Sequence, residues 1–138
     1  MLELILGTLL AAGTVYYVLR PILRPGPPDA EAEGDERPVI ALVPGDRRGD
    51  MRKIARAAGA TRGRVAHARE VPALTGFAPG AVAPFALEQI DRVLIERVLL
   101  AYEELWIGAG STRHMAVLPT RELVRLTKAA PADLVTAD

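Results

Sequence analysis

Hydrophobic residues fill the first 23 positions of the chain almost without interruption. No charged residue lies between Leu4 and Leu19, and the run then continues to Leu23 with Arg20 inside it. A membrane-spanning helix needs about 20 apolar residues, and an arginine near its end can extend its charge to the interface. The pattern therefore predicts an N-terminal hydrophobic helix over 1–23 that anchors the chain in a membrane. A buried helix of the folded domain is the alternative.

The residues at the two ends of this segment predict its orientation. Tyr16 and Tyr17 lie near one end, as in an interfacial aromatic belt, and Arg20 and Arg24 follow. Since positive charge flanks the cytoplasmic side of a span, the rest of the chain is expected at the cytoplasmic face of a membrane, held by a single-pass anchor. Glu3 gives the segment an acidic start, which argues against a cleaved signal peptide.

Residues 24–37, RPGPPDAEAEGDER, change abruptly to proline, glycine and acidic side chains. Such a stretch buries little apolar surface and is expected to be an exposed linker. From 38 to 138 the chain returns to short apolar runs separated by turn residues. The predicted organisation is therefore an anchor over 1–23, an acidic linker over 24–37 and a folded domain over 38–138.

Within the domain, short apolar runs alternate with capping and turn residues. Asp50 and Thr120 are expected to cap the helices that follow them. Strands are predicted over 38–43, 64–67, 92–95, 104–107, 115–118 and 133–136. Helices or helical turns are predicted over 51–58, 69–75, 96–102 and 120–127. Short strands mixed with short helices indicate an α+β or mixed α/β domain.

Two loops have the composition of ligand-binding segments. The first, GFAPGAVAPF at 76–85, contains a G-x-x-x-P loop from Gly80 to Pro84, whose backbone N–H groups can bind a carbonyl or an oxyanion. The second, GAGSTRH at 108–114, holds the chain's only serine, Ser111, beside His114, one of two histidines. These two side chains can orient a substrate or a water. An ordinary connection and a structural histidine are the alternatives, and no G-x-S-x-G elbow supports a nucleophilic serine.

Charge and composition narrow the chemistry. Acidic and basic residues balance at 17 each, so net charge predicts no partner. The absence of cysteine excludes disulfides and thiolate chemistry. Because the chain has only two histidines as further metal ligands of this kind, we expect no metal and no cofactor. Basic residues gather between positions 47 and 69, against only Asp46 and Asp50. This stretch predicts contact with a polyanion, although a solvated helix face or a surface against an anionic leaflet fits it too.

In this order, four segments resemble the YbaK/prolyl-tRNA-synthetase-associated domain family of aminoacyl-tRNA deacylases. They are ALVPGDRRGDMRKIARAAGA (41–60), LTGFAPGAVAPF (74–85), ELWIGAGSTRH (104–114) and LPTRELVRLTKA (118–129). The resemblance implies a mixed, barrel-like sheet with short helices and a trans-editing function in translation fidelity. Such proteins hydrolyse the ester between a wrong amino acid and the terminal ribose of a tRNA, without a metal.

The resemblance also implies roles for individual residues. Catalytic roles fall on His114, Ser111 and Gly80. The pocket for the aminoacyl group would be lined by Gly80, Ala81, Val82, Pro84, Gly108, Gly110 and Ser111. Contact with tRNA is assigned to Arg47, Arg48, Arg52 and Lys53.

The sequence departs from the family pattern before residue 38. The family domain begins with further helices and a strand carrying a lysine, whereas no lysine here precedes Lys53. Glu96 stands where the family has an aspartate, and Ala86 where it has a glycine. Three readings follow: a deacylase, an inactive module that binds tRNA, an aminoacyl group or a protein, and a homo-oligomer in which a second chain completes the sheet.

Overall fold

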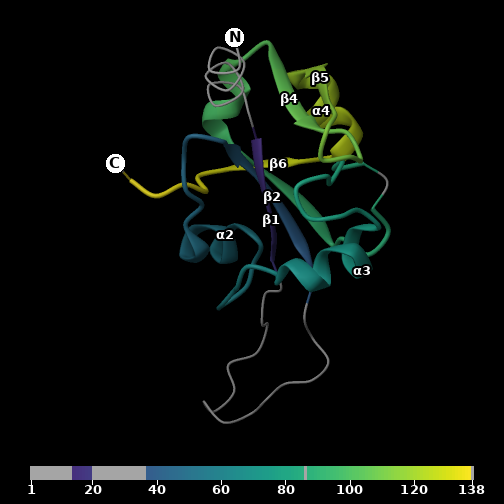
Figure 1. The fold of residues 1–138 in the computed structure, drawn as a ribbon. Coiled ribbons are helices and arrows are strands. Elements are labelled where there is room, and N and C mark those ends of the chain that lie inside the picture. The colour runs from purple at the N-terminus through teal and green to yellow at the C-terminus, as the bar shows by residue number, and fades with distance from the viewer. Residues whose placement is uncertain (1–13, 20–36, 86, 138) are drawn as a thin grey trace.

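The computed structural model describes residues 14–19, 37–85 and 87–137. The elements follow the order β1 (Thr14–Leu19), β2 (Val39–Pro44), α2 (Met51–Ala57), η1 (Ala68–Glu70), α3 (Val71–Thr75), β3 (Arg92–Glu96), η2 (Arg97–Ala101), β4 (Glu104–Gly108), β5 (Met115–Pro119), α4 (Thr120–Thr127) and β6 (Ala130–Ala132). Figure 1 shows helices and a second, smaller sheet arranged around a central sheet.

The central sheet has the strand order β1-β2-β3-β6. β1 pairs with β2 in antiparallel register, from Thr14 opposite Pro44 to Leu19 opposite Val39. β2 and β3 pair in parallel, as do β3 and β6. Every residue of β2 is buried, as expected for a strand of a sheet that is covered on both faces.

Two hydrophobic clusters cover the two faces of this sheet. Because side chains alternate along a strand, Ile40 and Leu42 enter one cluster, with α3, α4 and β4. Val39, Ala41 and Val43 enter the other cluster, where α2 packs through Ile54 and Ala58. α2 and α3 consequently lie on opposite sides of the sheet (Figure 1).

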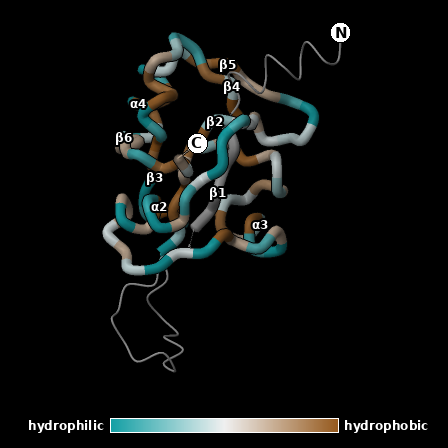
Figure 2. The backbone as a smooth tube through the Cα atoms, turned by 90° about the vertical axis from the view of Figure 1, so that its left-hand side faces the viewer, coloured by the Kyte–Doolittle hydropathy of each residue, from teal (hydrophilic) through white to brown (hydrophobic). Residues whose placement is uncertain are grey.

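β4 and β5 form a separate antiparallel hairpin with Leu105 opposite Leu118. α4 follows directly after β5. Hydrophobic and hydrophilic stretches alternate along α4 (Figure 2), and its Leu123 is fully buried. The hairpin and α4 thus cover the first cluster, on the side of the sheet away from α2.

The prediction of a membrane anchor is wrong where the structure tests it. Residues 14–19 form β1, whose backbone pairs along its whole length with β2. In the described part of the chain no helix has the length and apolar character needed to cross a membrane. A single-pass anchor and a place at a membrane face are therefore not supported. The β-branched and aromatic residues of TVYYVL suit an edge strand. An apolar run of this length does not by itself distinguish a strand of a sheet from part of a membrane helix. Residues 1–13 and most of the expected linker lie outside the described residues.

β1 also corrects two expectations about the sheet. The free edge that we expected at β2 is occupied by β1, so the reason for a homo-oligomer that completes the sheet is lost. The described strands form an open four-stranded sheet and a separate hairpin rather than one barrel-like sheet.

The remaining secondary-structure predictions hold except in three places. Residues 64–67 form no strand, and the last strand is Ala130–Ala132 rather than 133–136. Val135 makes only an isolated bridge to Gly49. Asp50 caps α2 as predicted, accepting from the N–H groups of Arg52 and Lys53. Thr120 does not cap α4, because its hydroxyl donates to the Tyr102 carbonyl instead.

Candidate functional site

The two glycine-containing loops singled out by the sequence lie side by side. The loop from Gly80 to Pro84 follows α3, and the loop at 108–114 joins β4 to β5. The Gly110 N–H donates to the Ala81 carbonyl at 2.9 Å. This backbone hydrogen bond joins segments that are 29 positions apart (110 − 81) in the chain, so the fold brings the two predicted halves of the site together.

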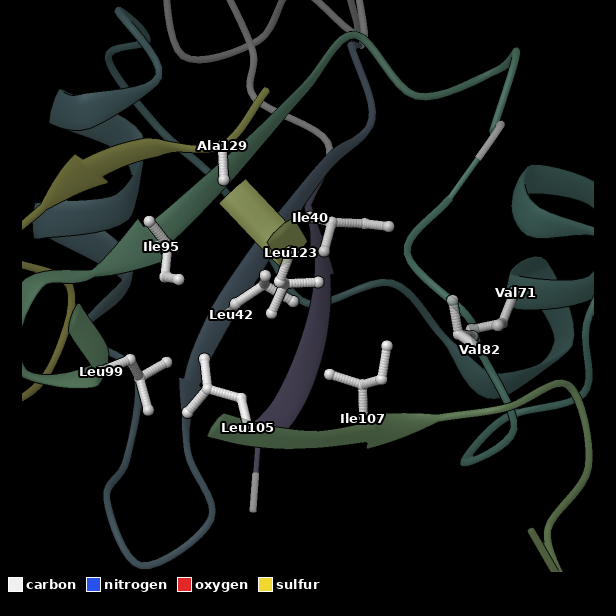
Figure 3. Packing of buried hydrophobic residues seen from close by; sticks show 10 residues of the cluster. All are labelled: Ile40, Leu42, Val71, Val82, Ile95, Leu99, Leu105, Ile107, Leu123 and Ala129. Carbon is white, nitrogen blue, oxygen red and sulfur yellow. The ribbon is translucent and has the colours of Figure 1, made fainter. Parts of the chain in front are cut away.

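Each loop is attached to the main core by a buried residue beside it. Val82 is 3% exposed and lies next to Val71 of α3 in Figure 3, while Ile107 near the end of β4 is fully buried in the same cluster. Ala81 is also buried, at 1% exposure. Because close-packed interiors resist displacement, this anchoring fixes the relative position of the two loops.

Glycine is required at two positions of the site. Gly80 has φ +81 and Gly110 has φ +89, a region that costs an L-residue about 1–2 kcal/mol. A Cβ at Gly110 would in addition lie 3.3 Å from Cε1 of Phe77, whereas one at Gly80 would meet nothing within 4 Å. Gly110 thus permits both the backbone turn and the close approach of Phe77.

Ser111 and His114 form a hydrogen-bonded pair. Ser111 Oγ lies 3.0 Å from His114 Nδ1 and accepts the Arg113 N–H at 3.1 Å. The imidazole is exposed, and its Nε2 bonds to no side chain or backbone group that the structure describes. The serine therefore orients the histidine through Nδ1 and leaves Nε2 for a ligand or a water.

The G-x-x-x-P loop presents backbone donors. The Ala81 N–H donates to the Ala78 carbonyl at 3.0 Å, which closes the turn. The N–H groups of Val82 and Ala83 reach no acceptor in residues 14–19, 37–85 or 87–137. Val82 is buried and Ala83 is partly buried. Since buried backbone donors are rarely left unpaired, these two groups are candidates for binding a carbonyl oxygen.

The remaining predicted pocket residues flank this centre. Gly108 is buried at the end of β4, and Pro84 is buried at the far end of its loop. Among the described residues no group of three or more His, Asp or Glu side chains converges as a metal site. No described carboxylate contacts His114, so a Ser-His-Asp triad is not assembled there.

The four basic residues assigned to tRNA contact lie apart from these loops. Arg52 and Lys53 are on α2, which covers the opposite face of the sheet, and Arg47 and Arg48 are in the turn that leads to it. Lys53 Nζ lies 2.9 Å from the Asp133 carboxylate and donates to the Val135 carbonyl at 2.8 Å. The assignment of these four residues to tRNA contact stays a prediction.

Glu96 has a structural position that the sequence did not indicate. Its side chain is 5% exposed, and Oε2 accepts the N–H groups of Leu134 at 2.5 Å and Val135 at 3.2 Å. Oε1 accepts the Val98 N–H at 3.4 Å. Glu96 thus ties the end of β3 to the C-terminal segment. The contact of Phe77 with Gly110 was also missed, although Phe77 belongs to the GFAPG stretch.

Comparison with known proteins shows the family to which the chain belongs. The family model described as "Aminoacyl-tRNA editing domain" matches residues 29–126. The chain is 24% identical over 101 residues to "Putative Cys-tRNA(Pro)/Cys-tRNA(Cys) deacylase EbsC" of Enterococcus faecalis (strain ATCC 700802 / V583), which covers 73% of this chain and 62% of the relative. It is 25% identical over 99 residues to "Multifunctional Ser/Thr-tRNA deacylase ProXp-y" of Escherichia coli (strain K12), which covers 71% of this chain and 59% of the relative.

A solved structure with the same fold is titled "Crystal structure of a putative trans-editing enzyme for prolyl tRNA synthetase". It superposes with a TM-score of 0.78 at 28% sequence identity and covers 99% of this chain and 78% of that one. The chain thus spans about three fifths of the length of the two curated relatives. The family match, which extends from before β2 into α4 and contains both loops, shows that the chain belongs to the aminoacyl-tRNA editing domain family.

Proposed function

We propose that this chain hydrolyses the ester bond of mischarged aminoacyl-tRNA at the two joined loops. The observation that supports the proposal is the hydrogen bond from Gly110 to Ala81, because it joins the loop that carries Ser111 and His114 to the G-x-x-x-P loop. An acyl-transfer site needs a group that handles a proton and donors for an oxyanion. The two loops supply one of each.

In the proposed reaction a water molecule attacks the carbonyl carbon of the ester. His114 Nε2 accepts a proton from that water, with Ser111 holding the ring through Nδ1. The negative charge on the former carbonyl oxygen is stabilised by the N–H groups of Val82 and Ala83. The bond from carbon to the ribose oxygen then breaks, and the proton returns to that oxygen. The products are the free amino acid and the tRNA with its terminal hydroxyl restored.

The names of the relatives suggest the first substrates to examine. One is described as a Cys-tRNA deacylase and another as a Ser/Thr-tRNA deacylase, and all three amino acids have small side chains. We propose a small amino acid as the substrate class. A tRNA charged with such an amino acid would be the partner, and prolyl-tRNA synthetase would be the enzyme whose errors are corrected.

A binding module without hydrolytic activity is the second candidate. β1 is the strand that precedes β2, and its sequence TVYYVL contains no lysine. If the lysine expected there is needed for substrate placement, the loops would still bind an aminoacyl group without cleaving its ester.

Hydrolysis of charged tRNA by the full chain separates these two functions. The panel should contain cysteinyl-, seryl- and threonyl-tRNA and a tRNA charged with a large amino acid, with His114→Ala and Gly80→Ala as variants. The deacylase proposal predicts release of a small amino acid that both variants slow. Binding of charged tRNA without release by the folded chain would support the second candidate.

A further inference from the structure

A cleft begins where the G-x-x-x-P loop ends. It has a volume of about 240 Å³. Its apolar lining comes from Pro84, Leu87, Ile90 and Leu126, and its two cations are Arg92 and Lys128. Pro84 therefore belongs both to the candidate site and to this cleft. Since Pro84 is four positions after Gly80, the connection is at most about 14 Å of extended chain.

The two cations line the same cleft from neighbouring parts of the sheet. β3 and β6 pair in parallel with Leu94 opposite Ala130. Arg92 is the first residue of β3, and Lys128 follows α4 two residues before β6 begins, so both cations lie near the starts of these two strands. Lys128 ends α4 in the left-handed conformation, at φ 54, and is the one non-glycine residue with positive φ in the described chain. The fold thus brings two like charges to one cleft, where a bound anion would interact favourably with both.

Acidic groups near the cleft do not balance this charge. Asp91 is the carboxylate at the cleft, and its Oδ2 lies 3.7 Å from Arg92 Nε and 3.6 Å from a guanidinium nitrogen of Arg37. One carboxylate is therefore shared by two arginines. Lys128 forms no ion pair with any residue that the structure describes. The cleft consequently combines a net positive charge with a partly apolar lining.

We propose that this cleft binds the sugar–phosphate backbone of the RNA, at the nucleotides that precede the aminoacylated one. This inference rests on the proposed function for the identity of the ligand. Lys128 and Arg92 contact phosphate oxygens, and the apolar residues pack against the sugars. Phosphate contacts fix the register of a nucleic acid on a protein. Binding in the cleft would therefore position the aminoacylated end of the RNA at the joined loops. A polyanion fits the cleft better than a neutral ligand because two cations share one carboxylate there.

The direct test is binding of an uncharged RNA hairpin that ends in the single-stranded terminus of tRNA, measured by fluorescence anisotropy at several salt concentrations. The test variant is Arg92→Gln/Lys128→Asn, in which asparagine tolerates the left-handed backbone. The control is Arg97→Gln/Arg121→Gln, which removes two exposed cations elsewhere, Arg121 being at the opposite end of α4. We expect the test variant to bind roughly 5- to 20-fold more weakly near 0.1 M salt, and its salt slope to fall by about two. The control should keep the slope of the unmodified chain.

Equal affinities and slopes for the test and control variants would overturn the proposal. Unfolding in urea shows whether each variant is folded. A variant that binds weakly and is also unfolded is replaced by the single substitution Lys128→Asn, for which the expected loss of slope is about one. The variant Arg52→Gln/Arg56→Gln tests the alternative that the RNA backbone binds to the basic side chains of α2. If that variant alone loses affinity, the RNA backbone lies on the other face of the sheet and the cleft is excluded.

A kinetic comparison separates this inference from the proposed function. With charged tRNA, the cleft variant should raise KM several-fold and leave kcat within about twofold, because the phosphate contacts are the same in the ground state and the transition state. With an aminoacyl ester of adenosine alone, it should match the unmodified chain. No hydrolysis of either ester by any folded form would reject the deacylase, while the binding experiment would still decide on the cleft.

Discussion

The Gly110 N–H donates to the Ala81 carbonyl at 2.9 Å, and this bond joins the two halves of the candidate site. Both loops are anchored in one hydrophobic cluster, the first through Val82 within it and the second through Ile107 just before it. The position of the Ser111–His114 pair relative to the G-x-x-x-P loop is therefore set by the core of the domain.

Substituting Gly110 with alanine should both destabilise the domain and slow hydrolysis. The residue has φ +89, and its Cβ would lie 3.3 Å from Phe77 Cε1, so we expect a loss of about 1–3 kcal/mol in the free energy of unfolding. Gly80→Ala has the same backbone cost without the contact. Gly63→Ala, with a Cβ 3.8 Å from that of Ala55 and no positive φ, is the neutral control. Urea unfolding should give the order Gly110, Gly80, Gly63, and an equal effect at all three positions would contradict the account.

His114 and Ser111 should differ in their kinetic effects. His114→Ala removes the group that accepts the proton of water, and we expect kcat to fall by about 10²-fold or more. Ser111→Ala removes only the partner of Nδ1, so the loss should be smaller. Thr112→Ala, exposed in the same loop, is the control. Accumulation of an acyl group on Ser111 in a rapid-quench experiment would mean that the serine is a nucleophile and that this assignment is wrong.

Glu96→Gln should destabilise the domain although the change is nearly isosteric. The buried carboxylate accepts three backbone N–H groups, from Leu134, Val135 and Val98, and hydrogen bonds to a charged group contribute about 1.5–3 kcal/mol each. We expect a loss of about 1–3 kcal/mol in the free energy of unfolding, since one oxygen remains. Glu104→Gln, at an exposed position of β4, should change it by less than about 0.5 kcal/mol. A neutral result at Glu96 would show that the C-terminal segment is held by other contacts.

The pairing of β1 with β2 can be tested by proline substitution. In an antiparallel pair, successive residues alternate between bonding to the neighbouring strand and pointing away from it. Of Tyr17→Pro and Val18→Pro, which face Ala41 and Ile40, one therefore loses a ladder bond and should unfold at a lower urea midpoint. The other should stay close to the unmodified chain. If neither proline lowers the midpoint, residues 14–19 are not a strand of the sheet.

The domain after residue 38 was largely predictable because its signals are local. Asp50 caps α2, and the apolar runs at 92–95, 104–107 and 115–118 fall inside β3, β4 and β5. The strand β1 was mistaken for part of an anchor because a short apolar run suits a strand and a membrane helix alike. Only its pairing partner β2, at least 20 residues further along the chain, decides between them.

For the candidate site, the sequence named both loops but not the bond between them. That bond depends on the packing of Val82 and Ile107, which no local pattern encodes. The basic stretch was conspicuous in the sequence, yet α2 places part of it on the other face of the sheet. Arg92 and Lys128 are far apart in the chain, and only the fold brings the first residue of β3 and the end of α4 to one cleft.

The measurement that tests the central claim most directly is the rate of ester hydrolysis of cysteinyl-, seryl- and threonyl-tRNA by the full chain, compared with the rate without protein. The account predicts that at least one ester is cleaved faster than it hydrolyses spontaneously, and that His114→Ala and Gly110→Ala reduce this acceleration. Hydrolysis at the spontaneous rate for every ester, by a chain shown to be folded, would contradict the assignment of a deacylase to these loops.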